Sequence, residues 1–123
     1  MIASCRRLWL TAAAANGAIG MCGGALAAHG YSGNHLDFLE IAVRYQLIHA
    51  LVLLTIGIWP LAGRWSMAAG MLFLAGAILF CGSLYATSLF EVPSTPLVPL
   101  GGTSLILGWV ALGVAPWRDQ KSE

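Results

Sequence analysis

The chain has 123 residues, of which 59% are hydrophobic and 9% charged, and its formal net charge is +1. Soluble domains carry about 25% charged residues, and so short a chain buries too little of its surface to hide this much apolar area from water. The composition therefore predicts a membrane protein, and the small net charge excludes the basic surface of a nucleic-acid-binding protein.

Four apolar stretches follow one another, each long enough to cross a hydrocarbon core of about 30 Å as a helix. We predict helices at residues 8–28, 41–61, 66–90 and 97–115, joined by a polar segment at 29–40, a tight turn at 62–65 and a proline-rich segment at 91–99. Pro99 fits the first turn of the last helix, which is expected to end at Pro116. The sequence thus predicts an all-α membrane protein with a single domain, residues 1–123, folded as a compact bundle of four transmembrane helices.

Basic residues predict the orientation. With the N-terminus inside, only Arg44 lies toward the outer side, and the other basic residues are cytoplasmic: Arg6, Arg7, Arg64, Arg118 and Lys121. This positive-inside bias predicts that both termini face the cytoplasm, and we expect the cell inner membrane. Four tryptophans fall at the same boundary, as an aromatic belt predicts: Trp9, Trp59, Trp65 and Trp117.

The first apolar stretch has an alternative interpretation. Arg6 and Arg7, the apolar run and Ala25-Leu26-Ala27 also fit a signal peptide with its cleavage site. The run is longer than the apolar part of most signal peptides, and it carries a packing pattern that a discarded segment does not need. We therefore favour a retained helix.

That pattern consists of small residues at helical spacing. The first helix has Ala13, Gly17, Gly20, Gly24 and Ala27, and the last has Gly101, Ser104, Gly108, Ala111 and Ala115. In the third helix the pairs Ala68–Ala69, Ala75–Gly76 and Gly82–Ser83 recur every seven residues. Small residues on one stripe let helix backbones approach closely in a membrane. The glycines of these stripes are expected to pack against neighbouring helices, within this chain or in another protein.

Polar residues inside the apolar stretches are the candidates for a site. Asn16 lies near the middle of the first helix, where a polar side chain needs a partner. Tyr45, Gln46 and His49 share one face of the second helix. With His29, Arg44 and Tyr85, these residues could form a polar pocket on the outer half of the bundle. Such a pocket could bind a small ligand, relay protons or hold a metal or haem. The simpler interpretation is a hydrogen-bond network between helices.

No metal or cofactor is expected. Cys5, Cys22 and Cys81 lack metal-ligand spacing and are interpreted as free thiols. A zinc site would have to gather His35, Asp37, Glu40 and His29, whose spacing matches no zinc pattern. The sequence also contains no phosphate-binding loop, nucleophile elbow or zinc-protease motif.

Four segments resemble one family. In their order along the chain, they are similar to motifs of the YgdD-like family of small membrane proteins, catalogued as domain of unknown function 423. The segments are residues 24–30 (GALAAHG), 45–51 (YQLIHAL), 80–85 (FCGSLY) and 99–102 (PLGG), the last followed by Gly108-Trp109. The family also includes the eukaryotic transmembrane protein 256. Ala27 replaces a usual glycine and Cys81 a usual serine. The resemblance implies a four-helix inner-membrane protein with both termini inside, and it implies no particular activity.

The leading functional hypothesis is a non-enzymatic membrane protein that packs against partners in the lipid bilayer, as an accessory subunit or a homo-oligomer. The alternative is small-ligand binding or transport through the polar pocket. A third reading, haem or metal binding, is disfavoured because His29 and His49 fall at different depths.

Overall fold

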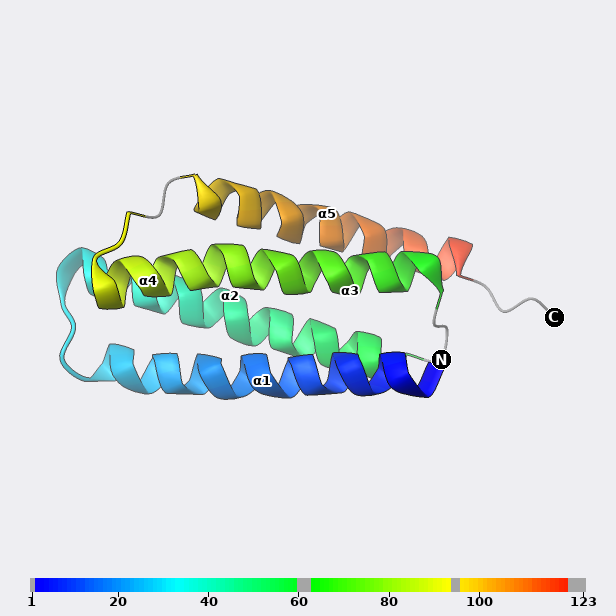
Figure 1. Cartoon of the computed structure of the whole chain (residues 1–123), viewed down its shortest axis with the longest axis horizontal. Coiled ribbons are helices and arrows are strands. Elements are labelled where there is room, and N and C mark those ends of the chain that lie inside the picture. Colours follow the sequence, from blue (N-terminus) through cyan, green and yellow to red (C-terminus); the bar gives the residue numbers. More distant parts are fainter. Residues whose placement is uncertain (1, 60–62, 94–95, 120–123) are drawn as a thin grey trace.

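The computed structural model of the chain describes residues 2–59, 63–93 and 96–119, and the elements in these ranges are helical. They are α1 (Ile2–Ala28), α2 (Gly33–Ile58), α3 (Arg64–Gly76), the π-helical segment η1 (Ala77–Cys81), α4 (Gly82–Phe90) and α5 (Leu97–Arg118). Because α3, η1 and α4 form one continuous helix, the chain folds as a bundle of four long helices (Figure 1). Each is long and apolar enough to cross a membrane, which confirms the predicted fold class.

Three helices start earlier than predicted. α1 begins at Ile2 instead of Leu8, α2 at Gly33 instead of Ile41, and α3 at Arg64 instead of Ser66. The predicted polar connection is therefore reduced to residues 29–32, and two glycines with positive φ, Gly30 and Gly33, form its turn. The first turns of α2 are polar, yet they are helical. Their acidic side chains, Asp37 and Glu40, are exposed, so the helix does not have to bury them.

At the other end of the bundle, α5 continues through Pro116 to Arg118, beyond the predicted end. A proline in the last turn removes one hydrogen bond from a helix end that is already exposed, so the helix is not broken there. α2 ends at Ile58, before the predicted end at Leu61, and the backbone of Trp59 is extended, as is usual for a residue that precedes a proline. Leu61 itself, the start of the following turn and Lys121 lie outside the described residues.

The third membrane span changes neighbours along its length. α3 packs mainly against α5, whereas α4 packs mainly against α2. The π-helical segment η1 lies between them and contacts both α2 and α5. α1 packs mainly against α2, so much of its surface is left without a neighbour within the chain.

The main apolar core lies between the helices at the level of α3. Leu53, Ala69 and Phe73 are fully buried there, together with Trp9 of α1. Trp9 packs against Gly70, where an added Cβ would lie 2.7 Å from the indole ring. This corrects the assignment of Trp9 to an aromatic belt, whereas Trp65 and Trp117 at the same end are exposed.

Most of the predicted small-residue contacts form inside the chain. Four glycines pack closely against a neighbouring helix: Gly20 against Leu47, Gly76 against Leu105, Gly101 against the backbone of Phe80, and Gly108 against Phe73. Gly24 makes an ordinary van der Waals contact with Val43. Gly17 and Gly82 make no such contact within the described part of the chain, because a Cβ added at either would meet no atom within 4 Å. The stripes therefore hold this bundle together.

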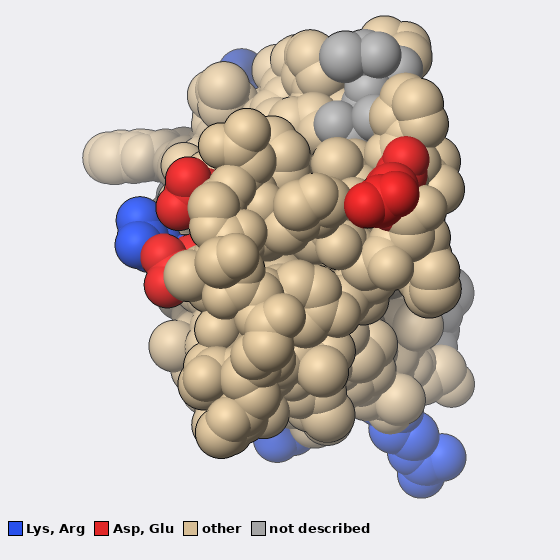
Figure 2. All heavy atoms as spheres, turned by 90° about the vertical axis from the view of Figure 1, so that its left-hand side faces the viewer, with Lys and Arg blue, Asp and Glu red and all other residues tan. Residues whose placement is uncertain are grey.

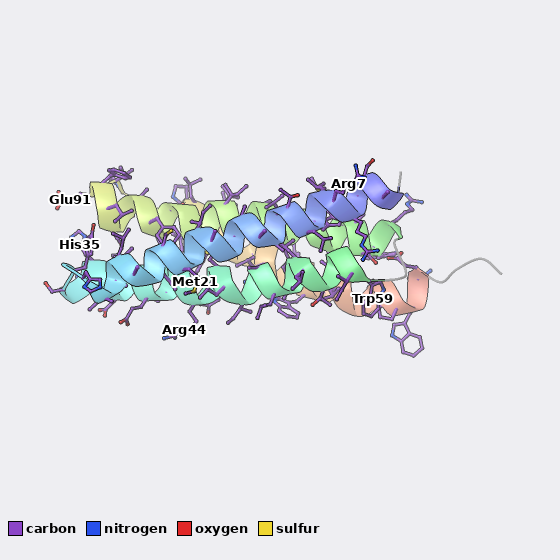
Figure 3. The ribbon with its side chains drawn as sticks, turned by 90° about the horizontal axis from the view of Figure 1, so that it is seen from below. Arg7, Met21, His35, Arg44, Trp59 and Glu91 are labelled. Carbon is purple, nitrogen blue, oxygen red and sulfur yellow. The ribbon has the colours of Figure 1, made fainter. Side chains whose placement is uncertain are left out.

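The two ends of the bundle differ in charge. The starts of α1 and α3 and the ends of α2 and α5 meet at one end, and this end carries Arg6, Arg7, Arg64 and Arg118. The opposite end carries Asp37, Glu40 and Glu91, and Figure 2 shows acidic side chains on that face. We call these the basic end and the acidic end. Figure 3 shows Arg7 and Trp59 at the basic end and His35 and Glu91 at the acidic end.

Candidate functional site

A chain of hydrogen bonds joins three helices near the middle of the bundle. The amide of Gln46 is its centre: Nε2 donates to Oδ1 of Asn16 on α1 at 3.3 Å, and Oε1 accepts from the hydroxyl of Tyr85 on α4 at 2.6 Å. Asn16 in turn donates from Nδ2 to the carbonyl of Ala12 at 2.9 Å. Asn16 and Gln46 are buried, so each depends on these bonds to compensate for leaving water.

Gly23 of α1 makes room for the phenol in this network. A Cβ added to Gly23 would lie 2.7 Å from the Tyr85 hydroxyl oxygen, so a larger residue would push the phenol away from Gln46. Sequence reasoning missed this glycine because it lies beside the stripe of Gly20 and Gly24 and not on it.

His49 forms a second polar contact, one helical turn further along α2. Its Nδ1 lies 2.7 Å from the carbonyl oxygen of Tyr45, and its Nε2 lies 3.2 Å from Nε1 of Trp109 on α5. A carbonyl can only accept and an indole N–H can only donate. These partners therefore fix a neutral imidazole with its hydrogen on Nδ1, and both ring nitrogens of this buried histidine are occupied.

Aromatic rings surround His49. Its ring centroid lies 5.4 Å from that of Phe73 and 5.9 Å from that of Trp109, and the ring of Tyr45 lies 4.9 Å from that of Phe80. Tyr45 contributes its backbone carbonyl to His49, while its side chain is partly exposed at the side of the bundle. Trp109 was not among the predicted site residues, because a tryptophan in an apolar helix gives no sign of which neighbour it contacts.

The remaining predicted members lie apart from this network. His29 is exposed just after the end of α1, and Arg44 is exposed on α2, where Figure 3 shows it projecting away from the bundle. The structure thus brings Asn16, Gln46 and Tyr85 together and places His49 beside them. It leaves His29 and Arg44 outside.

The acidic end offers no metal site within the described part of the chain. No three His, Cys, Asp or Glu side chains gather there or elsewhere in these ranges. His35, which lies on α2 and not in a loop, instead has its Nδ1 3.1 Å from the carbonyl oxygen of Ser88. This contact ties the start of α2 to α4.

At the basic end, the carboxylate of Asp119 caps the start of α3. It accepts hydrogen bonds from the backbone N–H of Trp65 at 3.0 Å and of Ser66 at 2.6 Å, and from the hydroxyl of Ser66 at 2.6 Å. Burial alone would raise the pKa of the Asp119 carboxyl, but the bonds from Ser66 and Trp65 outweigh it and hold the pKa below its usual value. A residue just beyond the last helix thereby ties the end of α5 to the start of α3.

In the central network, the polar side chains already have hydrogen-bond partners within the chain. Asn16, Gln46, His49 and Tyr85 each bond to groups of this chain, and the two ring nitrogens of His49 have no capacity left for a metal or a haem iron. Such an arrangement fixes the rotation of the helices about their axes, because each bond forms at only one register. It does not present an activated nucleophile or base.

Comparison with known proteins points to membrane proteins. A family described as "Protein of unknown function (DUF423)" matches residues 23–102. The chain is similar to a UPF0382 membrane protein of Staphylococcus aureus, with 35% identity over 91% of this chain and 97% of that one. A UPF0382 membrane protein of Haemophilus influenzae shares 31% identity over 91% of this chain and 95% of that one. The UPF0382 membrane protein YwdK of Bacillus subtilis shares 36% identity over 75% of this chain and 81% of that one. No solved structure matches.

Proposed function

From the membership of this chain in the DUF423 family of membrane proteins, we propose that it is a non-enzymatic component that packs α1 against a transmembrane helix of a second subunit. We further propose that it resides in the cytoplasmic membrane with both ends in the cytoplasm. The positive-inside rule supports this orientation, since the basic end carries Arg6, Arg7, Arg64 and Arg118.

The observation that carries the proposal is the outer face of α1. Five small exposed residues follow one another along this helix in steps of four and three: Thr11, Ala15, Ala18, Cys22 and Ala25. Steps of four and three place residues on one face, where a second helix can approach closely. This stripe is distinct from the glycines of α1 that pack against α2.

The outer face of α5 provides the contrast. Its exposed residues include Ile106, Leu107, Trp109, Val110 and Trp117, which are large. Lipid chains accommodate large apolar side chains, whereas small residues are enriched where helices meet in membranes. α1 also exposes the large side chains of Leu8, Ile19, Met21 and Leu26. The difference between the two helices is the continuous run of small exposed residues on α1, which α5 lacks, and this run favours α1 as the helix that meets another helix.

The first occupant that we propose for this face is α1 of a second copy. Chains with the same orientation bring the two α1 helices together in parallel, so Cys22 of one copy faces Cys22 of the other near the symmetry axis. A disulfide needs Cα atoms about 4.4–6.8 Å apart, and a crossing of small residues reaches such distances.

Oxidative crosslinking in native membranes tests this arrangement. We expect a Cys5→Ser variant to form a disulfide-linked dimer through Cys22, and a variant with both Cys5→Ser and Cys22→Ser to form none. Ala18→Leu is expected to abolish the dimer. Ala75→Leu is the matched control, because it makes the same change at an exposed position of α3.

Mild-detergent purification separates the two forms of the proposal. A complex of this chain with itself identifies a homo-oligomer, and a stoichiometric second membrane protein that is lost in Ala18→Leu identifies an accessory subunit. A strictly monomeric species without a bound protein, insensitive to Ala18→Leu, would overturn the proposal.

The alternative of a ligand or transport pocket is not supported by the geometry of the network. Such a pocket needs polar groups free to meet a substrate, but Asn16, Gln46 and Tyr85 bond to one another. His29 and Arg44, which a pocket would also need, lie outside the network.

A further inference from the structure

One face of α2 changes from charged to apolar along its length. Its residues are all exposed and follow one another in steps of three and four, which places them on one side of the helix. In order from the acidic end, they are Asp37, Glu40, Arg44, Ile48 and Leu51. We call them the outer row of α2. In Figure 2, which looks onto the acidic end, basic atoms project from the same edge of the bundle as acidic side chains.

Arg44 lies inside the part of α2 that crosses the membrane. α2 ends at Ile58, and Arg64 and the exposed Trp65 follow at the basic end. At about 1.5 Å per residue, Arg44 lies about 21 Å from Ile58, whereas the hydrocarbon layer is about 30 Å thick. With one surface of this layer at Ile58, the Cα atom of Arg44 is about 9 Å below the opposite surface.

From this depth, the guanidinium of Arg44 is directed toward the lipid headgroups at the acidic end. A charge is costly in hydrocarbon, and long basic side chains extend to the interface to avoid it. Helix side chains lean toward the helix N-terminus, and α2 begins at the acidic end. Figure 3 shows Arg44 projecting away from the bundle. Among the described residues, no carboxylate lies within ion-pair distance of Arg44, so its charge is available to a lipid phosphate.

Carboxylates lie above this guanidinium on the same row. Glu40 is about 6 Å and Asp37 about 10 Å nearer the acidic end along the helix axis. From the water inward, the row is therefore negative and then positive. A complementary headgroup has its cation outermost and its phosphate next to the acyl chains, which is the order in phosphatidylethanolamine. Phosphatidylglycerol lacks the cation, and the ammonium of phosphatidylcholine has no N–H to donate to a carboxylate.

The apolar residues of the row suit the rest of the lipid. Ile48 and Leu51 lie one and two helical turns deeper than Arg44, and both are exposed. An acyl chain that descends from a phosphate at Arg44 covers them with apolar surface. The row thus offers, in one line, a partner for each part of the lipid: ammonium, phosphate and chain.

We propose that the outer row of α2 binds one phosphatidylethanolamine molecule of the leaflet at the acidic end. The Arg44 guanidinium pairs with the phosphate, and the ammonium donates to the carboxylate of Glu40, with Asp37 adding negative charge beyond it. This site is on α2, so it goes beyond the helix contact proposed for α1, and either proposal can fail without the other.

Native mass spectrometry of the full chain, released from nanodiscs, tests the proposal. The probes are phosphatidylethanolamine, phosphatidylcholine and phosphatidylglycerol with identical acyl chains. The expected result is one phosphatidylethanolamine retained per chain, with affinity about tenfold above that of either other lipid, because only this lipid donates hydrogen bonds to the carboxylate from a cation. Equal retention of the three lipids, or preferred retention of phosphatidylglycerol, would overturn the proposal.

Two variants address the two halves of the headgroup separately. Arg44→Gln should weaken the retention of phosphatidylethanolamine and phosphatidylcholine by the same factor, about tenfold, because both lipids carry the phosphate. Glu40→Gln should weaken only phosphatidylethanolamine, because only its ammonium donates to the carboxylate. Loss of both lipids in Glu40→Gln, or of neither in Arg44→Gln, would contradict the assigned pairing.

Glu91→Gln is the matched control for Glu40→Gln. It removes an exposed carboxylate from the same end of the bundle, and Figure 3 shows Glu91 on the side opposite to Arg44. The control should retain phosphatidylethanolamine like the natural sequence. Equal losses in the two variants would indicate a general attraction of the acidic end for cations and would overturn the proposal.

Two further outcomes also count against it. If Glu40 and Arg44 pair with each other, neither neutralising variant changes lipid retention. Competition by millimolar phosphoethanolamine, with the same dependence on Glu40 and Arg44, would assign the site to a free headgroup and not to a lipid. Circular dichroism of each variant verifies that the helices remain formed.

Discussion

Oδ2 of Asp119 lies 2.6 Å from both the backbone nitrogen and the hydroxyl of Ser66, so a residue beyond the last helix caps the start of the third membrane span. These bonds hold the pKa of Asp119 below its usual value, against the opposing effect of burial. Because the folded-state pKa is depressed, the stabilisation is present above the unfolded value of about 3.9 and is lost as pH falls through the folded value.

We therefore predict an acid-sensitive melting temperature that depends on Asp119. The natural sequence should lose about 1 kcal/mol between pH 5 and the acidic limit, the typical contribution of a helix cap. Asp119→Asn should be less stable at pH 5 and should lack most of this pH dependence. Thermal unfolding in detergent, followed by circular dichroism, measures both effects. An unchanged pH dependence in the variant would contradict the prediction.

Gly63 tests the same contact from the other side. An added Cβ at this position would lie 2.2 Å from Cγ of Asp119, so Gly63→Ala should displace the cap and lower stability about as much as Asp119→Asn. The two changes should not be additive in the double variant, because they remove the same interaction. Gly113→Ala is the control, since nothing lies within 4 Å of the added group there.

Two adjacent glycines should respond differently to the same substitution. A Cβ at Gly101 would lie 2.4 Å from the backbone nitrogen of Phe80, whereas at Gly102 it would make an ordinary 3.7 Å contact with the ring. Gly101→Ala should therefore destabilise the protein by about 1–3 kcal/mol, because backbone cannot move aside easily. Gly102→Ala should be neutral or stabilising by about 0.5 kcal/mol. Unfolding in mixed detergent micelles measures the difference, and equal effects would contradict the packing of α5 on η1.

The hydroxyl of Tyr85 should contribute to stability through Gln46. Tyr85→Phe removes one hydrogen bond and leaves Oε1 of Gln46 without this donor, which should cost about 1 kcal/mol. In a Gln46→Leu background the same change should cost much less, because the partner is already absent. A Tyr85→Phe penalty that is the same in both backgrounds would show that the hydroxyl acts elsewhere.

The partners of His49 predict a single tautomer. Nitrogen-15 spectra should show a neutral ring with its hydrogen on Nδ1, and Trp109→Phe should alter the Nε2 resonance because it removes the indole donor. His29 is exposed and serves as an internal reference for a histidine in exchange with water. A hydrogen on Nε2 of His49 would be incompatible with the indole bond.

The four membrane spans could be predicted from the sequence because lipid imposes a simple requirement on length and composition. The same criterion misplaced the start of α2, since it finds where the apolar part begins and not where the helix begins. Asp37 and Glu40 continue the helix in contact with water, and hydropathy cannot distinguish such residues from a loop.

The candidate site could be predicted only in part. Asn16 indicated a buried hydrogen bond by its depth, but its partner depends on the rotation of α1 and α2 about their axes, which local sequence does not determine. Trp9 shows the same limit, since its position near a helix end fits a membrane interface and also a core. Asp119 gave no signal, because it caps a helix 53 positions away in the chain.

The π-helical segment holds one residue more than a regular α-helical turn would. Loss of one residue within Ala77–Cys81 would restore regular α-helical geometry and leave the residues beyond it on the same face, because the wide turn already absorbs the extra residue. Tyr85 would then still face Gln46. Insertion of a residue into the regular helix just before Tyr85 would instead rotate everything beyond it by about 100° and break this bond. Such an insertion should therefore be far more damaging than a deletion within Ala77–Cys81 or a conservative apolar substitution at the exposed Ile78.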